Sequence, residues 1–167
     1  MTDENSNIRP LVLRGGDGDI LGAIEAVRDR FMLEGRESSG RLAILQHLMP
    51  ARALVAPLHR HSREDEFSFV LEGRVGALLG SEEVFAEAGD LVFKPRGQWH
   101  TFWNAGEQPA VVLEIISPGG FEQAFREMHA LADSLDPEKM ATIASRYGCD
   151  TDFEATAGVI EKHGLTF

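Results

Sequence analysis

The amino-acid sequence predicts an all-β core, a small antiparallel β-barrel or jelly roll, followed by a C-terminal helical tail. Residues 41–118 form a series of short apolar or alternating runs separated by turn residues, as in sandwiches and barrels. After residue 118 the apolar residues recur at helical spacing instead. The chain has 167 residues, is 43% hydrophobic and 26% charged, and so has the size and composition of one structural domain.

The N-terminal segment, residues 1–40, is the hardest part of the chain to interpret. The apolar residues Ile20, Ile24, Val27 and Phe31 would fit a short helix. The glycines between positions 15 and 40 favour loops around one or two strands. In either case we expect this segment to pack on the barrel.

The barrel, residues 41–118, is expected to consist of short strands joined by tight turns. Glycines at 73, 80, 89, 97 and 106 mark turns between apolar runs. The predicted strands lie near residues 41–49, 54–61, 66–72, 74–79, 83–86, 90–94, 99–104 and 109–116.

The C-terminal extension, residues 119–167, is predicted to form helices that pack on the barrel. Apolar residues fall on one face between 121 and 131. A second helix is expected within 136–148, where Asp136 is the N-cap, and a third within 152–164.

The charge and cysteine content limit the partners and the location of the protein. The formal net charge is −11, from 16 basic and 27 acidic residues, which disfavours nucleic acids and anionic membranes as partners. Cys149 is the only cysteine, so no intramolecular disulfide can form and a reducing compartment is favoured. Neither a secretory signal nor an apolar run of membrane length is visible, and we expect a cytoplasmic protein.

Four residues have the spacing of a metal site. His59 and His61 are alternate residues of one strand, so their side chains project from the same face with Cα atoms about 6.6 Å apart. Glu66 can present its carboxylate from the next strand. His100 can supply a third imidazole from a later strand, which the intervening hairpins return to the same site. Each of these features alone is common on protein surfaces, and only their combination predicts a metal centre.

The two motifs that contain these residues resemble those of the cupin superfamily. Residues 59–73 read His-x-His, four residues, Glu, six residues, Gly. Residues 89–104 read Gly, five residues, Pro-x-Gly, two residues, His, three residues, Asn. Ala53 departs from the fullest form of the first motif, which has Gly there. A looser resemblance to single-domain, quercetin-dioxygenase-like cupins extends from about residue 28 to 130.

The resemblance implies a double-stranded β-helix fold with His59, His61, Glu66 and His100 as the metal ligands. It also implies that the motif glycines and proline are turn residues and that Asn104 satisfies backbone groups. Three imidazoles and one carboxylate suit one divalent transition metal per chain, among Fe, Ni, Mn, Co, Cu and Zn. Affinity should fall in acid, because histidine must be neutral to bind a metal ion.

Strand alternation predicts which residues line a substrate pocket beside the metal. If Glu66 points inward, so do Ser68 and Val70, and Phe102 follows His100 in the same way. His47 lies on an apolar strand and could approach the site. We expect His129 and His163, on the tail helices, to be exposed.

The same alternation turns Phe67, Phe69 and Trp103 outward. Large apolar side chains on the outside of a barrel need cover from a second sheet, from the helices or from another subunit. We therefore expect a homodimer.

The sequence leaves three functions open for such a site. The first is a metal-dependent dioxygenase acting on a small aromatic or dicarbonyl or enol substrate, with Glu66 able to leave the metal and act as a base. The second is a metal-dependent isomerase, decarboxylase or lyase of a small oxo acid. The third is a non-catalytic cupin that binds a small molecule.

Overall fold

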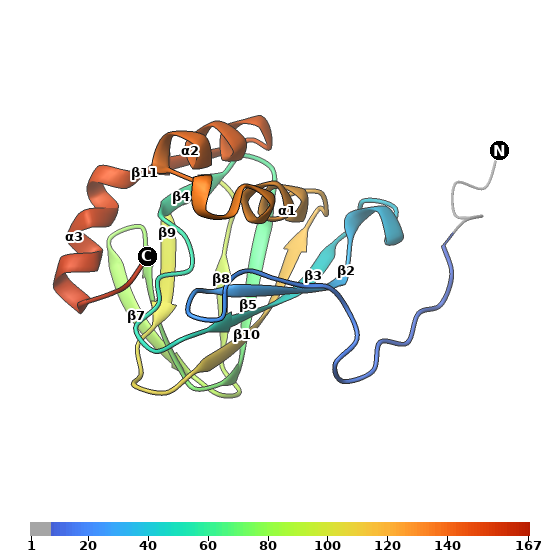
Figure 1. The fold of residues 1–167 in the computed structure, drawn as a ribbon, viewed down its shortest axis with the longest axis horizontal. Helices are drawn as coiled ribbons and strands as arrows, with labels where there is room; N and C mark the ends of the chain where they lie inside the picture. The colour runs from blue at the N-terminus through green and yellow to red at the C-terminus, as the bar shows by residue number, and fades with distance from the viewer. Residues whose placement is uncertain (1–7) are drawn as a thin grey trace.

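The computed structural model describes residues 8–167 as a barrel of two antiparallel sheets with helices along one end and one side (Figure 1). Residues 1–7 of the predicted N-terminal segment lie outside the described part. The strands are β1 (Ile20–Leu21), β2 (Arg28–Leu33), β3 (Ala43–Met49), β4 (Leu58–His61), β5 (Asp65–Glu72), β6 (Arg74–Leu79), β7 (Glu82–Glu87), β8 (Leu91–Lys94), β9 (His100–Asn104), β10 (Ala110–Ser117) and β11 (Cys149–Asp152). The helices are α1 (Glu122–Leu131), α2 (Pro137–Arg146) and α3 (Phe153–His163), with short 3-10 helices at Gly35–Glu37 and Ala132–Ser134.

The strand order confirms the jelly-roll architecture. One sheet has six strands in the order β1-β2-β3-β10-β5-β8, and the other has five in the order β11-β4-β9-β6-β7. Within the barrel the observed strands agree with the predicted ones, except that residues 54–57 form a loop before β4. From β3 to β6, and again from β7 to β11, successive strands lie in different sheets. Each motif therefore contributes one strand to each sheet, so that β4 lies beside β9 and β5 beside β8.

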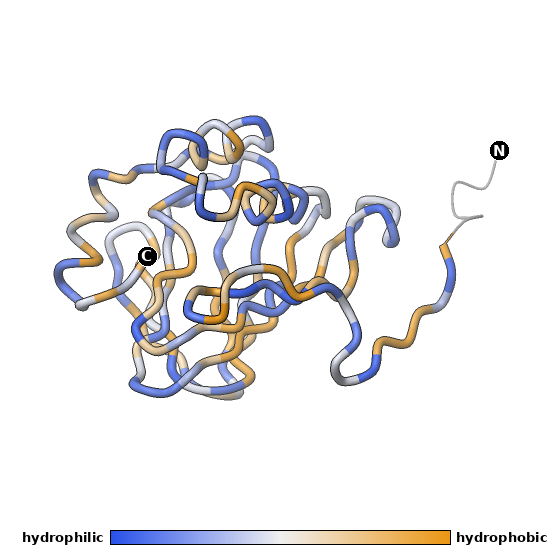
Figure 2. The backbone as a smooth tube through the Cα atoms, viewed as in Figure 1, coloured by the Kyte–Doolittle hydropathy of each residue, from blue (hydrophilic) through white to orange (hydrophobic). Residues whose placement is uncertain are grey.

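The barrel interior is filled by alternate residues of the strands. In β10 every second residue from Ala110 to Ile116 is buried, and β3 shows the same alternation. Figure 2 shows that hydrophobic residues are concentrated in the strands of the barrel. Each fully buried aliphatic side chain contributes about 1.5–3 kcal/mol of transfer free energy, so this packing holds the walls in place.

The N-terminal segment forms strands and no α-helix within its described residues. β2 pairs with β3, and the short β1 pairs with β2 at the edge of the six-stranded sheet. Of the two alternatives for this segment, the strands are therefore correct and the helix is wrong. Phe31 of β2 is buried because its side chain faces the core, as strand alternation requires.

The three tail helices lie where they were predicted. Asp136 and Asp152 cap α2 and α3 by accepting hydrogen bonds from backbone N–H groups at 2.8 Å, and Gly164 ends α3 with a φ of 61°. α1 and α2 pack apolar faces against β3 and β10. Among the described residues, no helix is long and apolar enough to cross a membrane.

The C-terminal segment covers the outer face of the five-stranded sheet. Trp103 points outward as predicted, yet it is only 1% exposed because Leu165 and residues of α3 pack over it. His163 lies against the same indole, with ring centroids 4.5 Å apart. The expectation that His163 is exposed is therefore wrong, since the tail folds back on the barrel.

Candidate metal centre

Three strands bring together the four residues predicted as metal ligands. β4 carries His59 and His61, β5 carries Glu66 and β9 carries His100. His59 and His100 are paired directly across β4 and β9. One nitrogen or oxygen atom of each residue lies within 4.8 Å of those of the other three, and all four side chains are buried. This spacing allows one ion to contact all four.

A tight turn of the second motif fixes the approach of β9 to β4. Gly97 has a φ of 78°, a conformation that glycine adopts without strain. Its N–H donates a 2.7 Å hydrogen bond to the carbonyl oxygen of His61. At the other end of β9, the Asn104 amide donates to three backbone carbonyls and accepts from one N–H, as predicted for this residue.

Two of the three histidines, His59 and His100, are held by hydrogen bonds on the side away from the centre. Nδ1 of His59 lies 2.7 Å from the carbonyl oxygen of Pro57, and Nδ1 of His100 lies 3.0 Å from that of Gln98. A carbonyl only accepts, so Nδ1 of each ring donates and the lone pair of the neutral ring is on Nε2. Such outer contacts fix the tautomer of a metal-binding histidine.

His61 supplies direct support for an ion at this place. Its Nδ1 and Nε2 are buried without a hydrogen-bond partner among the described residues. Nε2 lies 3.3 Å from Oε1 of Glu66, while Nε2 of His100 lies 3.1 Å from Oε2. Leaving a buried polar atom unsatisfied costs about 1–3 kcal/mol. A divalent transition metal bound by Nε2 would satisfy that atom, and three imidazoles with one carboxylate are a suitable donor set.

An ion pair with Lys94 stabilises the charge of Glu66, and the sequence did not indicate this role for Lys94. Lys94 Nζ is buried and lies 3.0 Å from Oε2 of Glu66 and 3.1 Å from Oε1 of Glu114. Burial alone would raise the pKa of Glu66, but the Lys94 ammonium and His61 hold it well below its ordinary value. Glu66 is therefore ionised, as a ligand must be. The two residues meet because they are paired directly across β5 and β8.

The histidines differ in their affinity for a proton when no ion is bound. Burial and the neighbouring imidazoles of His100 and His61 hold the pKa of His59 well below its ordinary value. Burial would also lower the pKa of His61, but the carboxylates of Glu66 and Glu64 raise it to about 9. An ion that binds near neutral pH must therefore displace a proton from His61.

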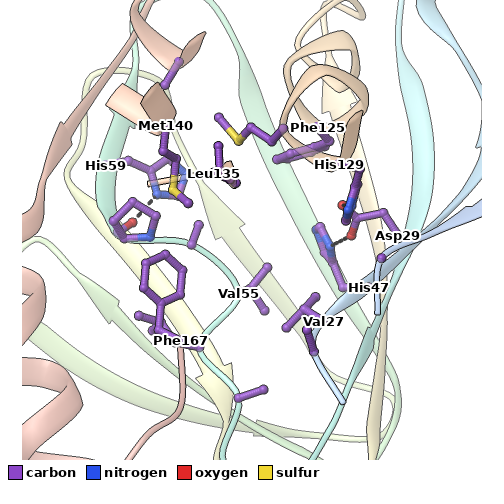
Figure 3. A pocket seen from close by; sticks show the side chains of 18 of the residues that line it. Val27, Asp29, His47, Val55, His59, Phe125, His129, Leu135, Met140 and Phe167 are labelled. Atoms are coloured by element: carbon purple, nitrogen blue, oxygen red, sulfur yellow. Dashed lines mark hydrogen bonds and ion pairs between the residues drawn. The ribbon is translucent and has the colours of Figure 1, made fainter. Parts of the chain in front are cut away.

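A cavity of about 790 Å³ opens beside the centre, and His59 and Glu66 form part of its wall. Aromatic and thioether side chains from the helices line much of the rest, as Figure 3 shows for Phe125 and Met140. This volume and lining are typical of sites for small organic ligands.

Two of the four residues predicted for the substrate pocket line this cavity. Phe102 and His47 are on its wall. Ser68 and Val70 point inward as predicted but lie in the packed interior. The Ser68 hydroxyl donates a 2.6 Å hydrogen bond to Glu114, and Val70 is part of the apolar core.

Several residues of the cavity wall come from segments that sequence motifs did not connect with the site. Cys149 belongs to β11, which pairs with β4 so that Cys149 lies opposite His61. Asp29 comes from β2, and His129 of α1 donates a hydrogen bond to its carboxylate at 2.8 Å. His129 is partly buried, so the expectation that it is exposed is wrong. Only its position on the same face of α1 as Phe125 could have indicated this.

Comparison with known proteins identifies a family over the part of the chain that carries the centre. A family described as "Cupin domain" matches residues 45–116. The tetracenomycin polyketide synthase protein TcmJ of Streptomyces glaucescens is 37% identical over 60 residues, which are 36% of this chain and 40% of that protein. Gentisate 1,2-dioxygenase of Ralstonia sp. is 29% identical over 120 residues, which are 65% of this chain and 32% of that protein.

Solved structures agree on the fold. The crystal structure of a predicted oxalate decarboxylase from Thermotoga maritima superposes with a TM-score of 0.60 at 21% identity, covering 65% of this chain and 99% of that one. The chain spans 40% or less of the length of the curated relatives it matches.

Proposed function

From the premise that this chain is a member of the cupin superfamily, we propose that it is a metal-dependent, dioxygenase-like enzyme acting on a small aromatic or dicarbonyl or enol substrate. The observation that carries the proposal is the complete set of three histidines and one glutamate on the wall of a largely apolar cavity. The similarity to gentisate 1,2-dioxygenase supports the same reaction class.

The four donors leave room for a substrate at the ion. A transition metal that prefers five or six ligands keeps positions open when the protein supplies four, and when bound it supplies Lewis acidity and redox chemistry toward dioxygen. His59 and His100 hold their positions through backbone hydrogen bonds, so the donor set is arranged before substrate binds.

The protein groups around the ion have separate tasks in this proposal. Glu66 is ionised and faces the cavity, so we assign it as the acceptor of a proton from a substrate hydroxyl. Phe102 and Phe121 provide an apolar wall that orients a flat substrate and excludes water from the centre.

Oxygen consumption tests this proposal. Protein loaded with Fe(II), Mn(II) or Ni(II) should consume dioxygen with at least one flavonol, catechol or β-diketone, and the His61→Ala variant should not. Equal turnover with and without oxygen would instead place the protein among metal-dependent isomerases, decarboxylases or lyases. Binding without turnover of any compound would make it a small-molecule-binding cupin.

We also propose that the protein is a homodimer. The outer face of β5 and β8 exposes Phe69, Leu91 and Phe93. Phe67 stacks on Phe93 with ring centroids 4.9 Å apart, so these side chains form one apolar patch. The tail helices cover Trp103 but leave this patch open. A second copy of the chain would remove the patch from water.

A further inference from the structure

A second polar group lies on the cavity wall away from the metal centre. Asp29 of β2 accepts hydrogen bonds from two histidines, with its Oδ1 2.7 Å from Nδ1 of His47 and its Oδ2 2.8 Å from Nε2 of His129. His47 comes from β3 and His129 from α1, so three elements meet here. Figure 3 shows this group and His59 on different sides of the cavity, with Val55 and Leu135 between them in this view. Asp29, His47 and His129 all line the cavity.

The other nitrogen of His47 has no hydrogen-bond partner among residues 8–167. His47 is only 2% exposed, and Nδ1 is used by Asp29. The nearest acidic atom to Nε2 is Oε2 of Glu114, at 3.9 Å, which is beyond hydrogen-bond distance. That carboxylate already accepts from Ser68 and pairs with Lys94. A buried donor that lacks a protein partner is expected to find one in a ligand.

The charges around His47 favour the protonated ring. Burial would lower its pKa, but the carboxylate of Asp29 and that of Glu114 raise it, while Lys94 opposes them. The pKa of Asp29 is lowered to about 2, because its contacts with His47 and His129 outweigh the effect of burial. His129 is the other titratable group in contact with this carboxylate. Nε2 of His47 is then a donor, and the group that complements it is an acceptor oxygen, best an anionic one.

The space between the two polar ends suits a ring. Phe125 of α1 lies edge-on to His47, with ring centroids 5.8 Å apart, and Phe102 does so at 5.5 Å. Both phenylalanines line the cavity, so a flat apolar body that enters it can contact their rings while its polar groups reach the two ends.

We propose that His47, held by Asp29 and His129, is a second substrate-binding residue, and that it donates a hydrogen bond to a carboxylate carried by an aromatic substrate. The oxygens at the other end of that substrate would reach the metal centre, and this part alone rests on the proposed function. A purely structural role for the group, in which Asp29 and the histidines only attach α1 to the sheet, would give no preference for a carboxylate ligand.

Binding of benzoate and benzamide to the full-length protein tests the proposal, because the two probes have nearly the same size and differ in charge. Both are titrated calorimetrically into the protein as purified and after metal removal with a chelator. We expect benzoate to bind more tightly than benzamide by about tenfold, the change typical of a hydrogen bond to a charged group. His47→Gln should abolish this preference, and Met140→Leu, a change elsewhere on the cavity wall, should preserve it.

A second measurement does not depend on how the variant folds. In wild-type protein, long-range ¹H–¹⁵N spectra should show a shift of the His47 Nε2 resonance with benzoate and none with benzamide. The proposal is overturned if the metal-free protein binds the two probes equally or binds neither at millimolar concentration, or if the resonance does not move. Because these measurements need neither metal nor turnover, they distinguish failure of this inference from failure of the proposed oxygenase activity.

Discussion

The ammonium of Lys94 lies 3.0 Å from Oε2 of Glu66, inside the barrel and beside the metal centre. The same ammonium pairs with Glu114 at 3.1 Å, so one cation lies between two buried carboxylates. Burial alone would lower the pKa of Lys94, yet the two carboxylates raise it above its ordinary value. Without a bound metal ion, Lys94 and protonated His61 thus compensate the charge of Glu66.

Replacing Lys94 by Met should destabilise the metal-free protein strongly. The variant removes the cation that two buried carboxylates share, and breaking a buried ion pair in this way costs about 3–5 kcal/mol. Urea unfolding of chelator-treated protein measures the change. The matched control is Lys162→Met, whose exposed pair with Glu83 should contribute no more than about 1 kcal/mol. Similar small losses in both variants would show that the Lys94 pairs do not stabilise the fold.

Metal affinity should increase with pH between about 7 and 9. Although burial favours neutral His61, the nearby carboxylates raise its pKa to about 9, so below that pH an ion must displace its proton. The apparent association constant should therefore rise about tenfold per pH unit and level off above pH 9. Competition titrations with Zn(II) at several pH values measure this slope, and a flat profile would contradict the protonated state of His61.

The same proton affects the stability of the metal-free protein in the opposite sense. Because the pKa of His61 is raised from 6.5 to about 9, its contribution to stability is fully present below pH 6.5 and is lost as the pH rises through 9. For Asp29, whose pKa falls from 3.8 to about 2, the contribution is present above pH 3.8 and is lost as the pH falls through 2. Denaturant unfolding at a series of pH values should show both limits in metal-free protein, and stability that rises between pH 7 and 9 would contradict them.

A pair of glycine substitutions tests the cover over the five-stranded sheet. A Cβ atom on Gly76 would lie 2.4 Å from the Trp103 ring, so Gly76→Ala should destabilise the protein by about 1–3 kcal/mol. Gly158 of α3 has open space around it, and Gly158→Ala should stabilise by about 1 kcal/mol through helix propensity. Thermal unfolding reports both effects. An unchanged midpoint for Gly76→Ala would mean that Trp103 is not packed against β6.

Light scattering tests the proposed homodimer. Wild-type protein at micromolar concentration should have twice the mass of one chain, and Phe93→Lys should shift it toward the monomer because a charge then lies in the apolar patch. Phe167→Lys, which alters an exposed aromatic residue outside the patch, is the control. A monomeric wild type would contradict the proposal.

The sequence predicted those parts of the protein that depend on local spacing. The ligand set follows from strand alternation and from motif spacing, because residues two positions apart on a strand point to the same face of the sheet. Helix caps at Asp136 and Asp152 are similarly local. The sequence could not place Lys94 beside Glu66, or Asp29 beside His129, because these contacts join residues 28 and 100 positions apart.

Short polar elements were also beyond prediction. β11 has only four residues and the composition of a loop, and it becomes a strand because β4 offers a free edge to pair with. Cys149 enters the cavity wall through this pairing. Ser68 and Val70 were predicted to face inward, as they do, but strand alternation cannot tell a cavity wall from a packed interior.

Elemental analysis of protein purified without chelators shows whether the four residues hold a metal ion. We expect close to one divalent transition metal ion per chain in the wild type and in His163→Ala, whose histidine lies outside the centre, and almost none in His61→Ala. Wild-type protein that stays empty after growth with added metals, or a His61→Ala variant that retains the wild-type amount, would contradict this expectation.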